Sequence, residues 1–148
     1  MQIAQILTPD RIQSNVPSHS KKAALETLAA LIAGADPALT QSEVFNSLIT
    51  RERLGSTGLG QGVALPHGRL KNGERTLGAF IRLESGIDFD AVDHKPVDLL
   101  FALLVPEEST EEHLQILSRL AELFSKPEIL QSLRTEQSKE EIFSILTG

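Results

Sequence analysis

One stretch decides the fold: VDLLFALLV, residues 97–105, which Pro96 precedes and Pro106 ends. Its apolar side chains run almost without interruption, and such a run is typical of a strand that is buried on both faces. We therefore expect residues 97–105 to form the central strand of a sheet, with helices covering both sides of that sheet.

Two amphipathic helices are predicted on the N-terminal side of this strand. Ser20 precedes a helical pattern over residues 21–32, and Gly34 supplies its stop. A second helix begins at a capping box formed by Thr40 and Glu43. Its expected buried face consists of Val44, Phe45, Leu48 and Ile49.

Further helices are predicted after the central strand. Ser109 and Glu112 form a capping box ahead of a helix over residues 113–124. A short helix after Pro127 and a last helix with its own capping box complete the chain. The buried stripe of the helix over 113–124 is expected at Leu114, Leu117, Leu120 or Ala121, and Phe124.

The remaining segments predict shorter strands and turns. Residues 63–65 and 77–83 have strand character, and a turn is expected at 85–86. Residues 55–62 are predicted to be loop, because glycine recurs every two or three positions. The order of the elements predicts an α/β fold, a mixed β-sheet flanked by helices on both faces. No repeat or long linker is visible, so residues 1–148 are expected to form a single domain.

Composition excludes several classes of function. The chain has 148 residues, 41% hydrophobic and 23% charged, with a net charge of -6, which argues against a surface that binds nucleic acid or an anionic membrane. It contains no cysteine, so disulfides, Cys-ligated zinc and thiol nucleophiles are ruled out. No apolar run approaches the roughly 20 residues of a membrane span. A cytoplasmic protein is expected.

The glycine-rich segment GSTGLGQG, residues 55–62, does not match the common nucleotide-binding motifs. A P-loop needs Lys and Ser or Thr directly after its last glycine, whereas Gln61 follows Gly60 here. A dinucleotide fingerprint lies between a strand and a helix, and this segment follows a helix and precedes a strand. We expect no nucleotide cofactor.

His67 is the most informative residue beside this segment. It ends the sequence Leu65-Pro66-His67, and Gly68 follows it, so one rigid and one permissive residue flank the imidazole. This arrangement presents the ring to a ligand. On these local features alone, a surface or satisfied core histidine remains an equal alternative.

A longer pattern around His67 resembles a known family. Residues 51–69, RERLGSTGLGQGVALPHGR, resemble the phosphorylation-site signature of IIA proteins of the bacterial phosphoenolpyruvate-dependent phosphotransferase system, mannitol/fructose class. The resemblance continues through residues 101–106 and 111–114, and it is strongest to the nitrogen-regulatory branch of stand-alone IIA proteins.

The resemblance implies a phosphohistidine carrier with a regulatory role. It assigns His67 as the acceptor through Nε2, Arg51 as the active-site arginine and His113 as the second active-site histidine. An HPr-like phosphocarrier is the implied donor, and the regulatory targets are unknown. The resemblance implies no cofactor and no metal.

The chemistry of these residue types agrees with that assignment. A neutral imidazole attacks phosphorus without first losing a proton, provided that its other nitrogen donates to a fixed acceptor such as a backbone carbonyl. Arg51 can hold phosphoryl oxygens, although without the motif a solvated cation at a helix end would be the favoured interpretation. A helix start should keep His113 neutral. Further candidate phosphate contacts are Ser56, Thr57, Gly58, Gly60 and Gly62, although turn formation alone could explain them.

Two other functions remain open at this point. The protein could be a sugar-specific IIA that passes phosphate to a separate IIB protein, or a binding module whose chemistry is vestigial. His19 and His94 are interpreted as solvated surface residues. A zinc site shared by His67 and His113 lacks an evident third ligand. Residues Asp88, Asp90 and Asp93 miss the spacing of a calcium loop and are interpreted as a solvated turn.

Overall fold

The computed structural model describes residues 2–71, 73–108 and 110–148. Two short 3-10 helices, η1 (Ile3–Gln5) and η2 (Pro9–Arg11), precede the sheet. The strands are β1 (Ile12–Val16), β2 (Gly58–Gly60), β3 (Val63–Ala64), β4 (His67–Leu70), β5 (Leu77–Ile87) and β6 (Val97–Pro106). The helices are α1 (Lys21–Ala33), α2 (Gln41–Glu52), α3 (Thr110–Leu123), α4 (Pro127–Thr135) and α5 (Lys139–Thr147).

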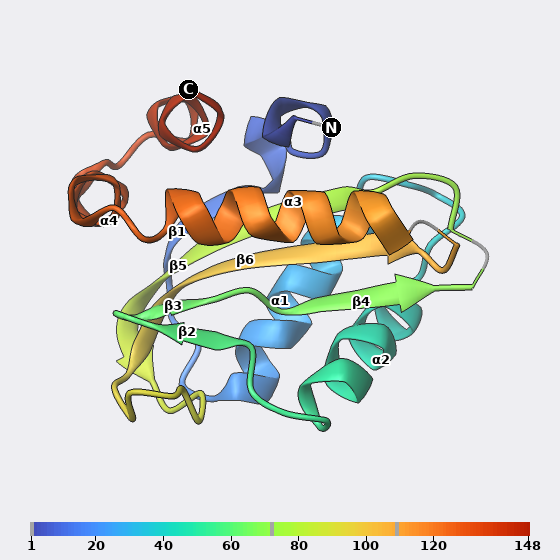
Figure 1. Ribbon diagram of the computed structural model, residues 1–148, viewed down its shortest axis with the longest axis horizontal. Helices are drawn as coiled ribbons and strands as arrows, with labels where there is room; N and C mark the ends of the chain where they lie inside the picture. The colour runs from blue at the N-terminus through green and yellow to red at the C-terminus, as the bar shows by residue number, and fades with distance from the viewer. Residues whose placement is uncertain (1, 72, 109) are drawn as a thin grey trace.

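The sheet is mixed, and β6 is its central strand (Figure 1). The strand order is β1-β5-β6-β3-β2, and β4 also pairs with β6. Strand β6 is antiparallel to β5 and parallel to both β3 and β4. The prediction of a mixed sheet with residues 97–105 at its centre is confirmed.

Helices cover both faces of the sheet (Figure 1). Alternate side chains of β6 belong to two separate cores: Leu100 and Leu104 pack with α1 and α2, whereas Phe101 and Leu103 pack with α3, α4 and α5. This alternation explains the continuous apolar run, because each face of β6 needs its own apolar set. None of the described helices combines the length and hydropathy that crossing a bilayer requires.

The predicted helix starts have the expected caps. Ser20 Oγ accepts a hydrogen bond from Ala23 N at 3.1 Å. Thr40 and Glu43 form the reciprocal capping box, with both backbone-to-side-chain distances at 3.2 Å. Ser109 lies outside the described residues. Gly34 does follow α1, but its φ of −64° is right-handed, so the helix ends there without the left-handed turn that glycine permits.

The strands differ from the prediction at four places. Segment 58–60 was expected to be loop but forms β2, antiparallel to β3. The turn expected at 85–86 is part of β5, which shifts register between Arg82 and Ile87 instead of turning. Strands β1 and β4 were not predicted, because β1 buries only its two ends and β4 contains a single apolar residue, Leu70.

The buried stripe along α3 includes Leu120 and Phe124, as predicted, but it is rotated relative to the prediction at the start of the helix. Ile116, Leu120 and Phe124 are buried, while Leu114 is 60% exposed. The inward-facing set therefore begins with His113, three residues before Ile116. This rotation moves a histidine to the interior and an apolar leucine to the surface.

Candidate functional site

His67 lies where the chain leaves β3 and begins β4. Both strands pair with β6, and Pro66 O accepts a hydrogen bond from Leu103 N at 2.9 Å between them. Gly68 then lets α2 approach closely, because a Cβ there would lie 2.8 Å from the backbone carbonyl of Ser47. The half-buried His67 ring is thus held beside the C-terminal half of α2.

The hydrogen bond of the His67 ring selects its tautomer. Nδ1 lies 2.8 Å from the backbone oxygen of Leu65. A carbonyl only accepts, so Nδ1 carries the proton and Nε2 carries the lone pair. Burial lowers the pKa of His67, and the Leu65 hydrogen bond opposes this shift only in part, while Arg51 reinforces it. The ring is neutral at pH 7, and the backbone acceptor expected from the sequence is present.

His113 lies in the first turn of α3 and contacts His67. The ring centroids are 5.1 Å apart and the rings meet edge to face at 61°. Burial, followed by the charges of His67, Arg69 and Arg51, lowers the pKa of His113 to about 4. His113 is only 6% exposed, and its Nδ1 is buried with no hydrogen-bond partner among the described residues.

Arg51 lies in the last turn of α2, as predicted. Its Nη1 donates to Gly55 O at 2.9 Å, which matches the interpretation of an arginine that satisfies carbonyls at a helix end. That bond uses one of the five N–H donors of the guanidinium. In the described part of the chain, Arg51 forms no ion pair.

Two cavities lie beside Arg51 and His67, and both residues line both cavities. One, of about 370 Å³, extends along the segment from Ser56 to Leu59 to the exposed face of α3. The other, of about 600 Å³, extends between α2 and β4 and includes His113. The structure therefore brings Arg51, His67 and His113 together.

The hydroxyls of Ser56 and Thr57 line the first cavity but already have partners. Ser56 Oγ donates to Phe89 O at 2.7 Å, and Thr57 Oγ1 donates to Glu52 Oε2 at 2.6 Å. Gly58 N donates to Ser56 Oγ at 3.1 Å. All three residues lie near His67, and their hydrogen-bonding groups hold the segment in place.

Gly60 and Gly62 are far from His67, so their expected phosphate contacts require correction. Strand β2 runs antiparallel to β3, and the connection that carries these glycines lies at the other end of β3 (Figure 1). Their φ values are 97° and 81°, and a Cβ on Gly62 would lie 2.9 Å from Asp98 Oδ1. They are needed for a tight turn. Neither of them lines a cavity beside His67.

Glu52, whose side chain is 1% exposed, was not among the residues predicted from the sequence. It accepts hydrogen bonds from Thr57 N at 2.9 Å and Thr57 Oγ1 at 2.6 Å, and it pairs with Lys21 Nζ at 3.0 Å. A signal was available: Glu52 continues the buried positions Val44 and Leu48 at a spacing of four residues.

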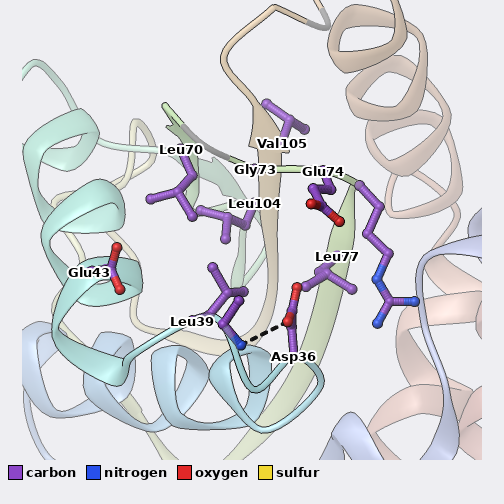
Figure 2. Close-up of a pocket in the computed structure, with 11 residues that line it drawn as sticks. Asp36, Leu39, Glu43, Leu70, Gly73, Glu74, Leu77, Leu104 and Val105 are labelled. Carbon is purple, nitrogen blue, oxygen red and sulfur yellow. Dashed lines mark hydrogen bonds between the residues drawn. The ribbon is translucent and has the colours of Figure 1, made fainter.

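A further cavity, of about 170 Å³, lies between the α1–α2 connection and the segment that joins β4 to β5 (Figure 2). Its charged groups support the nearby backbone: Asp36 Oδ1 accepts from Ala38 N at 2.9 Å, and Arg75 Nη2 donates to Ala35 O at 3.1 Å. Glu43 belongs to the capping box of α2. None of the three candidate residues Arg51, His67 and His113 lines this cavity.

The other candidates behave as surface groups. His19 and His94 are exposed. Asp88 accepts a hydrogen bond from Asp90 N at 3.0 Å, and Asp93 accepts from Gln61 N at 2.9 Å. These carboxylates stabilise the loop before β6.

Comparisons with known proteins agree with this fold. Residues 5–148 match the family model "Phosphoenolpyruvate-dependent sugar phosphotransferase system, EIIA 2". The chain is 43% identical to a nitrogen regulatory protein of Pseudomonas aeruginosa, over 99% of this chain and 95% of that protein. It is 34% identical to a fructose-specific EIIA component of the phosphotransferase system of Haloferax volcanii, over 97% of this chain and 94% of that one.

Among solved structures, the crystal structure of the nitrogen regulatory protein IIA-Ntr from Neisseria meningitidis superimposes with a TM-score of 0.93. The sequence identity is 47%, and the match covers 98% of this chain and 99% of that one. The similarity therefore extends over the sheet and the helices on both of its faces.

Proposed function

Since this chain belongs to the EIIA 2 family of the phosphoenolpyruvate-dependent sugar phosphotransferase system, we propose that it is a regulatory phosphocarrier whose His67 accepts a phosphoryl group. The donor in this proposal is the phosphohistidine of an HPr-like carrier protein. The observation that carries it is the hydrogen bond from His67 Nδ1 to Leu65 O, which leaves the Nε2 lone pair available beside Arg51 and His113.

The transfer forms one phosphorus–nitrogen bond and breaks another. The lone pair of His67 Nε2 attacks phosphorus in line with the donor nitrogen, which leaves with the electron pair of the broken bond. The neutral ring needs no prior deprotonation, in agreement with its lowered pKa. The remaining N–H groups of Arg51 hold the equatorial oxygens of the transferred group.

His113 stabilises the same oxygens as a neutral donor. Its pKa of about 4 keeps the ring uncharged at pH 7. Nδ1 is buried in the protein, so Nε2 is the nitrogen that can reach the cavity, and the tautomer with its proton on Nε2 can donate to a phosphoryl oxygen. The helix start in which His113 lies also favours an anion.

The regulatory part of the proposal rests on the relatives. Both the 43% identical protein and the superimposed crystal structure are named as nitrogen regulatory proteins. In this proposal the phosphorylation state of His67 controls binding to partner proteins in the cytoplasm. The absence of cysteine from the chain suits that reducing compartment.

Reconstituted phosphorylation tests the proposal. The protein is incubated with phosphoenolpyruvate, enzyme I and an HPr-like carrier, and the intact mass of the wild type is compared with that of His67→Ala. We expect an acid-labile phosphoryl group on the wild type alone. Equal labelling of both proteins would show that His67 is not the acceptor.

A sugar-specific role is the second candidate, favoured by the similarity to the fructose-specific EIIA component. In that case the phosphoryl group on His67 would pass to a IIB protein. Adding sugar and membrane extract to the phosphorylated protein separates the two: rapid sugar-dependent loss of phosphate supports a transport role, and retention supports regulation.

A further inference from the structure

Glu52 is a buried charged residue that takes no part in the proposed phosphoryl transfer to His67. It ends α2 directly after Arg51, and its carboxylate binds both the N–H and the hydroxyl of Thr57. Lys21 supplies the balancing charge at 3.0 Å and lies 4.6 Å above the centre of the Phe89 ring. A carboxylate this deeply buried requires such partners to stay ionised.

The hydrogen bonds continue from Glu52 to the His67 ring. Thr57, whose N–H and hydroxyl bind Glu52, accepts a hydrogen bond on its own carbonyl from Leu65 N at 3.0 Å. The carbonyl of Leu65 in turn accepts from His67 Nδ1 at 2.8 Å. Glu52 thus holds Thr57, Thr57 holds Leu65, and Leu65 holds the His67 ring.

We propose that Glu52 is a positioning residue that, through Thr57 and Leu65, fixes the tautomer and orientation of the His67 ring. This inference rests on the proposed function of His67, since it explains how the acceptor nitrogen is presented. It also explains why Glu52 accepts two hydrogen bonds from Thr57 in addition to its ion pair with Lys21.

The same anchor fixes the wall of the cavity in front of His67. Residues Ser56 to Leu59 form that wall, and Thr57 is tied to Glu52 while Ser56 is tied to Phe89 O at 2.7 Å. Without Glu52, Thr57 loses the two hydrogen bonds that hold it, so the Thr57 carbonyl that accepts from Leu65 N is no longer fixed. The ring is then free to populate the tautomer with its proton on Nε2, which cannot attack phosphorus.

Two substitutions at position 52 separate hydrogen bonding from charge. Glu52→Gln keeps an oxygen for Thr57 N–H and an amide that can donate to Thr57 Oγ1, whereas Glu52→Ala removes both bonds. The ring tautomer is read from nitrogen-15 chemical shifts of His67 in the unphosphorylated protein. Phosphoryl transfer from the HPr-like carrier is measured as a rate constant and a KM.

We expect Glu52→Ala to populate the second tautomer of His67 and to slow transfer by at least tenfold, with the KM for the carrier changed less than twofold. Glu52→Gln should restore the wild-type tautomer and most of the rate. Leu146→Ala, which truncates a buried side chain of α5, is the control: it should lower the thermal midpoint and leave the tautomer unchanged.

The outcomes distinguish this inference from the function on which it rests. If Glu52→Ala keeps the wild-type tautomer and rate, the inference is overturned. If the wild type accepts no phosphoryl group, the proposed function fails whatever the tautomer. Should Glu52→Ala not fold, Thr57→Val removes the hydroxyl bond alone, and it must shift the tautomer in the same direction or the inference falls.

Discussion

Two arginines at opposite ends of β3 have very different surroundings. Arg134 grips both carboxylate oxygens of Asp98, at 3.0 and 2.9 Å, and donates to Gln61 O at 2.7 Å. Arg51 donates once, to Gly55 O, and has no carboxylate partner among the described residues. Arg134 belongs to α4 and lines a cavity with Gln61 and Gly62, from the turn between β2 and β3, whereas Arg51 lies in the last turn of α2. Figure 1 shows α2 beside β4, at the end of the molecule away from α4.

This difference separates an arginine that supports the fold from an arginine that is available to bind a ligand. The guanidinium of Arg134 is bound to the carboxylate of Asp98, so few of its N–H groups remain free for a ligand. Arg51 lines the same cavity as His67 and His113, and none of the ion pairs of the described residues involves it, so its guanidinium is available to an anion. In the proposed function, that anion is the phosphoryl group transferred to His67.

Replacing each arginine with alanine tests these two roles, and the largest effect is expected for Arg51. Arg51→Ala should slow phosphoryl transfer by about 10²–10³-fold, as removal of one oxyanion donor does. Its free energy of unfolding should fall by at most about 1 kcal/mol, because the side chain makes one hydrogen bond in a partly exposed site. Single-turnover kinetics and urea unfolding measure the two quantities.

Arg134→Ala should give the opposite pattern. It leaves Asp98 and Gln61 O without their donor, so the free energy of unfolding should fall by about 1–2 kcal/mol. The transfer rate should stay within about twofold of wild type, since the site is untouched. A large rate loss in Arg134→Ala, or a large stability loss in Arg51→Ala, would erase the distinction.

Lowering the pH should reduce the free energy of unfolding because of His113. Its folded pKa of about 4 lies below the unfolded value of 6.5, so the unfolded chain binds more protons between these values and the stability contribution is lost as pH falls. From pH 7 to pH 5 this amounts to about 2 kcal/mol. His113→Gln should escape that loss, as measured by urea unfolding at both pH values. Equal decreases in both proteins would mean that His113 is not a buried neutral ring.

The smallest effect concerns the contact between α2 and β4. Gly68→Ala forces a Cβ against the Ser47 backbone, which moves Arg51 away from His67 and should slow transfer by about tenfold. Gly34→Ala is the control, because its Cβ would meet only ordinary contacts at 3.5 Å in a right-handed conformation. That variant should match the wild-type rate. Equal rates in the two variants would contradict the importance of this contact.

The sequence predicted the parts of the fold that local patterns encode. The apolar run of β6 and the caps at Ser20 and Thr40 depend on neighbouring residues, and all three were predicted in place. The phase of α3 was not, because it depends on where the helix meets the sheet. Strand β1 was missed because Asn15, with a φ of 55°, interrupts the alternation of its five residues.

The candidate site also has parts that the local sequence indicates and parts that depend on contacts between distant segments. The motif around His67 lies within one short segment, and its neighbours Pro66 and Gly68 indicated how the ring is held. The partner of Ser56 could not be predicted, because Phe89 is distant in the sequence and reaches it only through the tertiary fold. The partner of Thr57, Glu52, was missed although its spacing from Val44 and Leu48 indicated a buried position. Gly60 and Gly62 were assigned to the site by closeness in sequence, and the reversal of the chain at β2 separates them from it.

The identity of the nitrogen that carries phosphorus tests the central claim most directly. The protein is labelled with nitrogen-15 in its histidines and phosphorylated through the HPr-like carrier, and phosphorus–nitrogen coupling is recorded by NMR. We predict a bond from phosphorus to His67 Nε2, with Nδ1 still protonated and bound to Leu65 O. Phosphorus on Nδ1, or on another histidine, would contradict the account.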